Sequence, residues 1–250
     1  MAIVGIIPAR FASTRLPGKP LLSDTGRPMI RHVVEAARSA TVLDRVIVAT
    51  DDARIADAVR QFGGEVAMTR GDHPTGTDRV AEVVASIPDA RIIVNIQGDE
   101  PELAAESINR VASLLETDLE ASMATLATPI RDPSVWLDPS CVKVVGTRRG
   151  RALYFSRASI PFHRDGSPDL GADPPVALLH LGIYAYRRDF LLNYANLPPS
   201  RLESAEKLEQ LRVLEAGHPI ALGIVADRSI GIDTPEDYRR FVERWHAAHS

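Results

Sequence analysis

The sequence is poor in cysteine and carries no excess of positive charge. Cys141 is the single cysteine among 250 residues, so no disulfide can form within the chain. The formal net charge of −4 argues against a general nucleic-acid or membrane-surface binder, because both kinds of surface attract proteins with an excess of cations. We therefore expect no nucleic-acid partner, and any anion site must be built from a local group of cations.

Long apolar runs are also missing. No stretch approaches the roughly 20 apolar residues that a membrane-spanning helix needs, so we expect no membrane insertion. No basic-then-apolar signal segment precedes the first apolar run, and together with the single cysteine this predicts a cytoplasmic protein. Hydrophobic residues make up 45% of the chain, which is enough to bury a substantial core.

Several common ligand motifs are absent as well. The segment after the first apolar run has neither the GxxxxGK[ST] spacing of a P-loop nor GxGxxG, which excludes the ordinary ATPase and dinucleotide-binding interpretations. Neither CxxC nor HExxH occurs, so a zinc site is not expected. Cys141 has no evident histidine partner, and we interpret it as a packed thiol.

What the sequence does contain is a repeated alternation of strand and helix patterns. Short β-branched apolar runs predict strands, and between them apolar residues recur at helical spacing. The predicted strands cover 3–7, 46–49, 65–68 and 92–96, and the predicted helices begin at Pro28, at Asp51 or Asp52, and at about Asp78. Such alternation predicts an α/β fold with a doubly wound, mostly parallel sheet.

The alternation gives way to shorter pieces near Pro129, which predicts a smaller mixed α+β region. Later strands are expected at 142–145, 153–155, 181–184 and 220–224. Leucines 208, 211 and 214 form a stripe that predicts a helix, and residues 233–237 carry the capping signals of a last helix. We expect one main domain over residues 1–250.

Three cations follow the first predicted strand closely. Arg10, Arg15 and Lys19 fall within ten residues at the carboxyl edge, where open α/β sheets bind ligands. Arginine offers a planar fork to phosphate oxygens and lysine a mobile point charge, so a polyanionic ligand is expected. From spacing alone, three solvated surface cations explain the pattern equally well.

Two aspartates could supply a metal site. Asp99 directly follows an apolar strand, so its carboxylate should lie at the same edge, whereas Asp233 comes from a distant turn. Hard oxygen ligands of this kind suit Mg²⁺, which typically uses one or two carboxylates plus substrate phosphates. The alternatives are a turn residue for Asp99 and an ordinary helix cap for Asp233.

Thr75, Gly76 and Thr77 also allow two interpretations: they could bind an anion at a helix start, or they could simply begin that helix.

Residues 8–20 (PARFASTRLPGKP) closely resemble the signature of the 3-deoxy-manno-octulosonate cytidylyltransferases, the CMP-Kdo synthetases of lipopolysaccharide assembly. Further family-like segments follow in family order, so the resemblance spans nearly the whole chain. They lie at 69–77, 95–101 (NIQGDEP), 152–157 (ALYFSR), 180–184 (HLGIY), 208–212 (LEQLR) and 233–237 (DTPED).

The resemblance implies a Rossmann-like nucleotidyltransferase fold and a transferase that activates 3-deoxy-D-manno-octulosonate (Kdo) with CTP, giving CMP-Kdo and diphosphate. It implies Mg²⁺ as the cofactor, held by Asp99 and Asp233. The implied catalytic residues are Arg10, Lys19, Asp99 and Asp233. The implied CTP-binding residues are Pro8, Ala9, Arg10, Arg15, Lys19, Thr75, Gly76, Thr77, Arg79 and Gln97. The implied sugar-acid residues are Gln97, Arg157, His180, Tyr184, Glu209 and Gln210. Glu209 and Gln210 lie off the leucine stripe, which leaves them available to a ligand.

The resemblance also suggests how the single nucleotidyltransferase domain is organised. Residues 1–128 would mainly bind CTP, 129–200 would hold the sugar acid and form a homodimer contact, and 201–250 would complete the site. Three alternatives stay open: a cytidylyltransferase for another sugar acid (8-amino-Kdo or a sialic acid), a non-catalytic nucleotide-sugar-binding module, and a glycosyltransferase of related sheet architecture. The joint presence of Arg10, Lys19, Asp99 and Asp233 argues against the non-catalytic module.

Overall fold

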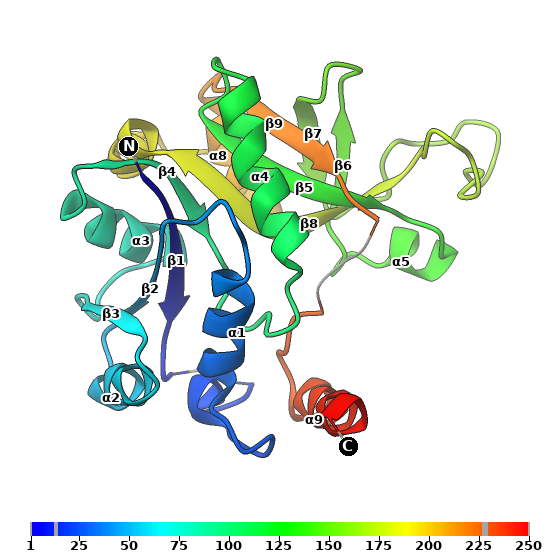
Figure 1. Ribbon diagram of the computed structural model, residues 1–250. Helices are drawn as coiled ribbons and strands as arrows, with labels where there is room; N and C mark the ends of the chain where they lie inside the picture. Colours follow the sequence, from blue (N-terminus) through cyan, green and yellow to red (C-terminus); the bar gives the residue numbers. More distant parts are fainter. Residues whose placement is uncertain (1, 13–14, 227–229, 250) are drawn as a thin grey trace. The chain divides into compact units, whose positions relative to one another are not determined.

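The computed structural model describes residues 2–12, 15–226 and 230–249 (Figure 1). Its chain forms two compact units, one made of Met1–Asn109 and Ser229–Ser250 and the other of Arg110–Arg228. These units are defined by compactness, so the functional division expected between residues 128 and 129 stays a prediction. The C-terminal segment returns to the unit that contains the N-terminus, which places residues 230–249 in the same unit as the first strand.

The first unit is built on a parallel sheet. Its strands are β1 (Ala2–Ala9), β2 (Arg45–Thr50), β3 (Glu65–Met68) and β4 (Ala90–Asn95), in the order β3-β2-β1-β4. β1 lies between β2 and β4, and its residues Val4, Ile6 and Ile7 are fully buried. The predicted β-branched runs therefore form the buried strands of a parallel sheet, as such runs typically do.

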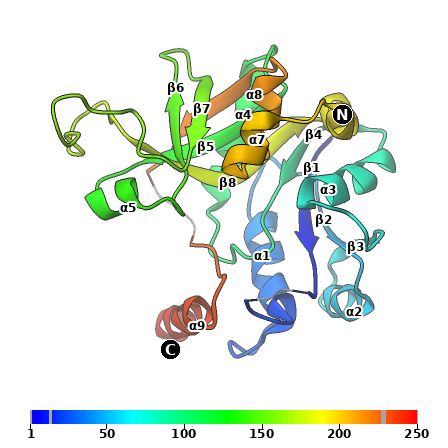
Figure 2. The ribbon, with the colours of Figure 1, turned by 180° about the vertical axis from the view of Figure 1, so that it is seen from behind.

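Helices α1 (Met29–Arg38), α2 (Ala53–Gln61) and α3 (Gly76–Ala85) connect these strands. α1 and α3 lie on opposite sides of β1 in both Figure 1 and Figure 2, as in a doubly wound sheet. α2 begins where the Asp52 side chain accepts a hydrogen bond from the Arg54 amide, and α3 begins where the Thr75 hydroxyl accepts one from the Asp78 amide. The short η1 (Lys19–Leu21), the start of α4 (Ala105–Thr117) and α9 (Pro235–His249) complete the unit.

The second unit is a mixed α+β structure. Strand β5 (Met123–Pro129) pairs antiparallel with β8 (Leu178–Arg187) and parallel with β9 (Ile220–Ile224). β6 (Lys143–Gly146) pairs antiparallel with both β7 (Ala152–Ser156) and β8. Its short helices are α5 (Pro133–Leu137), α6 (Arg188–Asn193), η2 (Tyr194–Asn196), α7 (Arg201–Glu206) and α8 (Gln210–Glu215).

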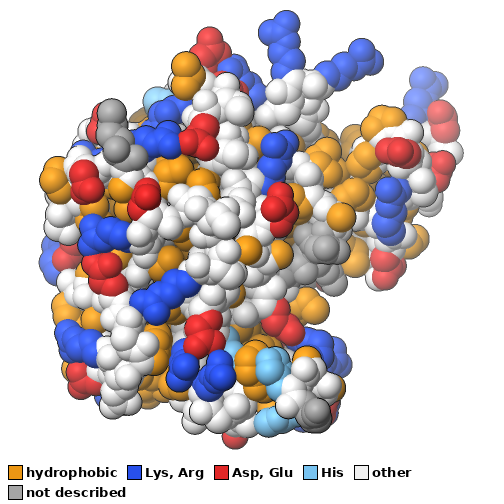
Figure 3. All heavy atoms as spheres, in the orientation of Figure 1, with side chains coloured by type: hydrophobic (Ala, Val, Ile, Leu, Met, Phe, Trp, Pro, Cys, Tyr) orange, Lys and Arg blue, Asp and Glu red, His pale blue; other side chains and the backbone are white. Residues whose placement is uncertain are grey.

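The predicted α/β class and mostly parallel first sheet are confirmed, and β3 and β9 have the predicted bounds. The helix expected around the leucine stripe starts only at Gln210, because Lys207 adopts a left-handed conformation (φ 56°) that ends α7. As a result Gln210 is buried (3% exposed) rather than lying on an open face. Among the described residues, no helix is both long and apolar enough to cross a membrane. Cations and anions alternate over most of the face drawn in Figure 3, as the small net charge predicts.

Candidate active site

Lys19 links two carboxylates at the carboxyl edge of the first unit's sheet. Its Nζ donates to Asp99 Oδ2 at 2.8 Å and to Asp233 Oδ1 at 3.3 Å, and also to the carbonyl of Ile232 at 2.8 Å. The Lys19 side chain is only 13% exposed, so solvent screens these ion pairs less than those of a surface lysine. Arg15 adds a second cation, with Nη2 3.0 Å from Asp233 Oδ1. The fold therefore brings together two of the three expected loop cations, Arg15 and Lys19, and both expected metal ligands.

The local backbone explains why Lys19 reaches this position. Gly18 has φ +67°, in the left-handed region that favours glycine, and its amide donates to the Phe11 carbonyl at 3.2 Å. A Cβ at Gly18 would lie 3.3 Å from the Phe11 ring, so the loop closes tightly over that ring. The guanidinium of Arg54 stacks on the same Phe11 ring, with its central carbon 3.4 Å from the centre of the ring. The loop is thus anchored to the start of α2 before the chain turns into η1.

Asp233 is positioned by the first turn of α9. Asp237 Oδ2 accepts hydrogen bonds from the amides of Asp233 (3.2 Å) and Thr234 (2.9 Å), and Thr234 Oγ1 accepts one from the Asp237 amide. This reciprocal arrangement is a capping box in which Thr234, not Asp233, provides the capping hydroxyl. The backbone of Ile232 also donates to the Asp99 carbonyl at 2.9 Å. The Asp233 carboxylate consequently faces Lys19 and Arg15 rather than the helix.

The third loop cation, Arg10, is directed to another segment. Its Nη2 donates to the carbonyls of His73 (2.6 Å) and Thr75 (3.2 Å), which holds the segment that leads into α3. Pro8 packs near Gly76, and a Cβ at Gly98 would come within 2.7 Å of the Pro8 carbonyl oxygen. The ends of β1 and β4 and the start of α3 therefore lie close together, as parallel strands of one sheet require.

Arg79 lies beneath this edge and is fully buried. Its Nη1 forms an ion pair with Asp51 Oδ1 at 2.8 Å and donates to Thr69 Oγ1 at 2.6 Å. Nε and Nη2 are buried without a hydrogen-bond partner among the described residues. Sequence reasoning missed Asp51 as the partner of Arg79, although its position directly after β2 is the same signal that identified Asp99. Direct contact between Arg79 and CTP stays a prediction.

The remaining CTP-site predictions occupy the same unit. Ala9 ends β1 and is buried, Thr77 is buried in the first turn of α3, and Gln97 lies in the turn after β4, where its carbonyl accepts from the Glu100 amide at 3.3 Å. Within the described residues, no group of three or more His, Cys, Asp or Glu side chains could hold a metal. A cation here would have two carboxylates, and its other ligands would come from substrate and water.

The other sugar-acid candidates lie in the second unit. His180 and Tyr184 both extend from β8, with ring centroids 5.5 Å apart, and the Tyr184 hydroxyl donates to Gln210 Oε1 at 3.5 Å. Gln210 Nε2 is buried and has no hydrogen-bond partner in the described part of the chain. An unpartnered buried amide is costly, so this nitrogen is well suited to donate to a bound hydroxyl or carboxylate.

The ring of His180 is held in a defined tautomer. Its Nε2 lies 3.0 Å from Thr125 Oγ1, and that hydroxyl donates its own proton to the Ile183 carbonyl at 2.8 Å. Nε2 must therefore carry the proton, which leaves Nδ1 as an acceptor. Burial lowers the pKa of His180 to about 3, so the ring is neutral near pH 7.

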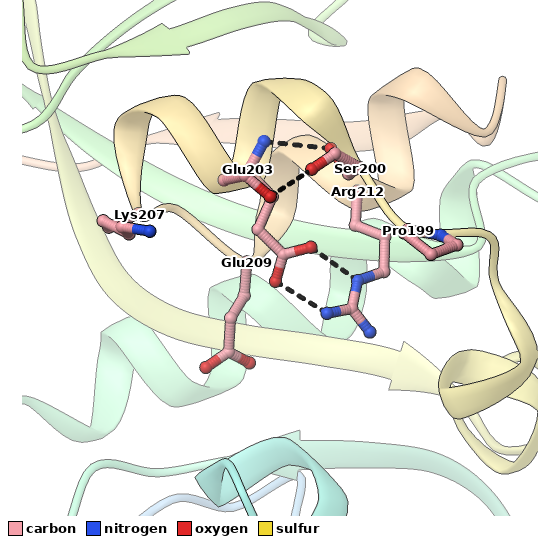
Figure 4. A pocket seen from close by; sticks show the side chains of 7 residues that line it. Pro199, Ser200, Glu203, Lys207, Glu209 and Arg212 are labelled. Atoms are coloured by element: carbon pink, nitrogen blue, oxygen red, sulfur yellow. Dashed lines mark hydrogen bonds and ion pairs between the residues drawn. The ribbon is translucent and has the colours of Figure 1, made fainter.

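Glu209 borders a cavity of about 340 Å³ between α7 and α8. Figure 4 shows its carboxylate directed away from the Glu203–Arg212 pair, which is closed on itself by two hydrogen bonds of 2.6 and 2.8 Å. The cavity is lined by Pro199, Ser200, Glu203, Ser204, Lys207, Glu209 and Arg212.

Arg157 lies at the end of β7. Its Nε donates to the Glu206 carbonyl at 2.8 Å and its Nη1 to the Pro139 carbonyl at 3.1 Å. A guanidinium has five N–H donors, so most of its donors have no acceptor in the described part of the chain. This arrangement fixes the side chain while leaving donors for a carboxylate.

Known proteins are similar to this chain in both sequence and architecture. A family model described as cytidylyltransferase matches residues 4–222. A 3-deoxy-manno-octulosonate cytidylyltransferase of Syntrophobacter fumaroxidans is 53% identical over 244 residues, covering 97% of this chain and 96% of the relative. One of Rhodopirellula baltica is 48% identical, covering 96% of both chains. A solved structure of a CMP:2-keto-3-deoxy-manno-octonic acid synthetase complexed with CTP superposes with a TM-score of 0.92 at 44% identity, covering 99% of this chain and 100% of that one.

Proposed function

The chain belongs to the cytidylyltransferase family, and we propose that its reaction, the transfer of CMP from CTP to Kdo, takes place at the site around Lys19, Asp99 and Asp233. The enzyme is a 3-deoxy-manno-octulosonate cytidylyltransferase that forms CMP-Kdo and diphosphate, a step of lipopolysaccharide biosynthesis. The observation that carries the residue assignment is the Lys19 ammonium, which contacts both carboxylates at the sheet edge.

The reaction needs little covalent help from the protein. The anomeric hydroxyl of the sugar acid attacks the α-phosphorus of CTP, an oxygen–phosphorus bond forms, and the bond to the departing diphosphate breaks. Catalysis of such a transfer is chiefly positioning and charge neutralisation. Arg10, Arg15 and Lys19 would neutralise the charge that accumulates on diphosphate, and Thr75, Gly76 and Thr77 would hold the nucleotide at the start of α3.

The residues present fit a magnesium ion. Asp99 and Asp233 supply hard carboxylate oxygens, and both reach one nitrogen, that of Lys19, within 3.3 Å. Mg²⁺ commonly binds one or two carboxylates and completes its octahedron with water and phosphate oxygens. When bound here it would neutralise phosphate charge and lower the pKa of the attacking hydroxyl. Asp99 and Asp233 are the residues that would hold it, and Lys19 keeps their charges together at the edge of the sheet.

The sugar acid requires donors for its carboxylate and hydroxyls. We assign the carboxylate to Arg157, whose guanidinium is fixed through two of its donors. His180 Nδ1 can accept from a hydroxyl, and Gln210 Nε2 can donate. Gln97, Tyr184 and Glu209 complete the proposed acceptor contacts.

We also propose a homodimer and a cytoplasmic location. The dimer is supported by the family resemblance and would involve residues 129–200. The location is supported by the single cysteine, since proteins of reducing compartments rarely depend on disulfides.

A substrate panel tests the assignment. Purified protein is given CTP and Mg²⁺ with Kdo, 8-amino-Kdo or a sialic acid, diphosphate release is followed, and the product is identified by mass spectrometry. We expect release with Kdo and a CMP-Kdo product. No release under conditions where a known synthetase is active would contradict the function, and calorimetric CTP binding without turnover would favour the non-catalytic module. Transfer of sugar from a finished nucleotide sugar would instead identify a glycosyltransferase.

A further inference from the structure

Lys143 is a fully buried lysine on β6. Its Nζ donates to the backbone carbonyls of Asp138 (2.8 Å), Cys141 (2.5 Å) and Arg157 (2.7 Å). Within the described part of the chain, no carboxylate forms an ion pair with it. Buried lysines are rare unless paired, so a buried ammonium that contacts only carbonyls needs an explanation.

The number of donors explains the charge state. Three carbonyls accept from this nitrogen, and only the protonated amine has three N–H groups. Burial lowers the pKa of Lys143, and the neighbouring Cys141, Asp138 and Glu206 side chains oppose that shift through their charges. A neutral amine would leave one carbonyl without its donor, so all three hydrogen bonds form only when Lys143 is charged.

The three carbonyls belong to two segments that both determine the position of Arg157. One carbonyl is that of Arg157 itself, which fixes the backbone at the end of β7. The other two, at Asp138 and Cys141, flank Pro139, whose carbonyl accepts from Arg157 Nη1 at 3.1 Å. Lys143 therefore holds both the backbone of Arg157 and a segment that its guanidinium contacts.

Glu206, at the end of α7, holds Arg157 from a second element. Its carboxylate accepts from the Arg157 amide at 2.8 Å and from Ser156 Oγ at 2.6 Å, and its carbonyl accepts from Arg157 Nε at 2.8 Å. Lys143 and Glu206 thus fix the same residue from two elements that are far apart in the sequence.

We propose that Lys143 and Glu206 are positioning residues that aim the guanidinium of Arg157 at the carboxylate of the sugar acid. The inference rests on the proposed role of Arg157. Neither residue contacts substrate in this proposal; each acts through Arg157. Loss of Lys143 should therefore weaken sugar-acid binding and leave CTP binding unchanged.

The test compares steady-state constants for Lys143→Met, Arg157→Gln and the double variant, with Arg148→Met as the control that removes an exposed cation from the turn between β6 and β7. We expect Lys143→Met to raise the KM for Kdo at least about tenfold, the scale on which small misplacements act, with the KM for CTP within about twofold. In the Arg157→Gln background the same substitution should have little further effect, because its target is gone. A merely structural role would lower the active fraction, and hence the apparent kcat, without this pattern.

The outcomes separate the two proposals. If Arg157→Gln leaves the KM for Kdo unchanged, the assigned role of Arg157 is wrong. If Arg157→Gln raises it but Lys143→Met does not, or if Lys143→Met has the same effect in both backgrounds, only the positioning inference is overturned. Should Lys143→Met fail to fold, Glu206→Gln replaces it in the same double-variant comparison and the same outcomes decide.

Discussion

Lys19 Nζ and Asp99 Oδ2 lie 2.8 Å apart although their residues are separated by 80 positions in the sequence. The contact joins the loop after β1 to the turn after β4, two parallel neighbours in the first unit's sheet. A partly buried ion pair at this edge places a mobile cation beside a carboxylate that could hold Mg²⁺.

Replacement of Lys19 should impair the chemical step. In Lys19→Met the cation that would follow charge onto diphosphate is lost, and we expect kcat to fall by about 10²- to 10³-fold, the usual effect of removing one preorganised charge-stabilising donor. Lys19→Arg should restore only part of the activity, since a planar fork cannot reproduce the contacts of a point charge. Diphosphate release measures the rate and circular dichroism verifies the fold. Turnover of folded Lys19→Met within about threefold of the parent, judged on the same scale, would refute the role.

Replacement of Asp99 should weaken metal binding. Asp99→Asn keeps the shape but removes a charge, so we expect weaker binding of Mn²⁺, used as a paramagnetic substitute for Mg²⁺, in the presence of CTP, and a kcat lower by orders of magnitude. Electron paramagnetic resonance measures free Mn²⁺ directly and does not depend on activity. Asp57→Asn, which alters an exposed ion pair with Arg60, is the matched control. Equal Mn²⁺ affinities in the two variants would show that Asp99 is not a ligand.

Much of the first unit could be predicted from the sequence because its signals are local. Buried parallel strands appear as short β-branched runs, and Asp52 and Thr75 cap helices with side chains that favour such positions. The site at the carboxyl edge of the sheet could be predicted in part, because several of its cations and carboxylates follow predicted strands in the sequence. The Thr234–Asp237 capping box was visible in the sequence too, but its consequence, an Asp233 carboxylate that pairs with Lys19 and Arg15 and does not cap the helix, depended on geometry.

The second unit was less predictable for a physical reason. Its helices α5, α6 and α7 contain only five or six residues, too few for a helical period to repeat. The burial of Gln210 depends on where α8 begins, which Lys207 decides through its left-handed backbone. Lys143 was overlooked because a lysine within an apolar run gives no sign that three backbone carbonyls, one of them 14 residues away, surround its Nζ. Tertiary hydrogen bonds of this kind leave no periodic pattern.

Gly18 and Gly26 offer a matched pair for testing the loop. Both have positive φ, +67° and +80°, so alanine at either position is strained by roughly 1 kcal/mol. Only at Gly18 would the new Cβ meet another side chain, the Phe11 ring at 3.3 Å; at Gly26 nothing lies within 4 Å. We expect both variants to lose similar stability in urea denaturation, and only Gly18→Ala to raise the KM for CTP. An equal change of KM in both variants would show that the contact of residue 18 with Phe11 does not influence CTP binding.

His180 predicts a pH dependence of stability. Burial against Phe155, Tyr184 and Thr125 lowers its pKa from the ordinary 6.5 to about 3 in the folded chain. Between these values the unfolded chain binds a proton that the folded chain does not, so the free energy of unfolding falls as pH decreases from 6.5 toward 3. Above pH 6.5 His180 is largely unprotonated in both the folded and the unfolded chain, so it no longer makes the free energy of unfolding depend on pH.

The expected difference is measurable with His180→Gln, which removes the titrating group. Between pH 7 and pH 5 the parent should lose at most about 2 kcal/mol more stability than this variant, since one pH unit corresponds to about 1.4 kcal/mol per proton. Urea denaturation at both pH values gives the two differences, and other histidines cancel in the comparison. His249→Gln, at an exposed position of α9, should leave the parent's pH dependence nearly unchanged. If the parent and His180→Gln lose equal stability, the ring of His180 is not shielded from protonation, and its assignment as a neutral acceptor through Nδ1 is wrong.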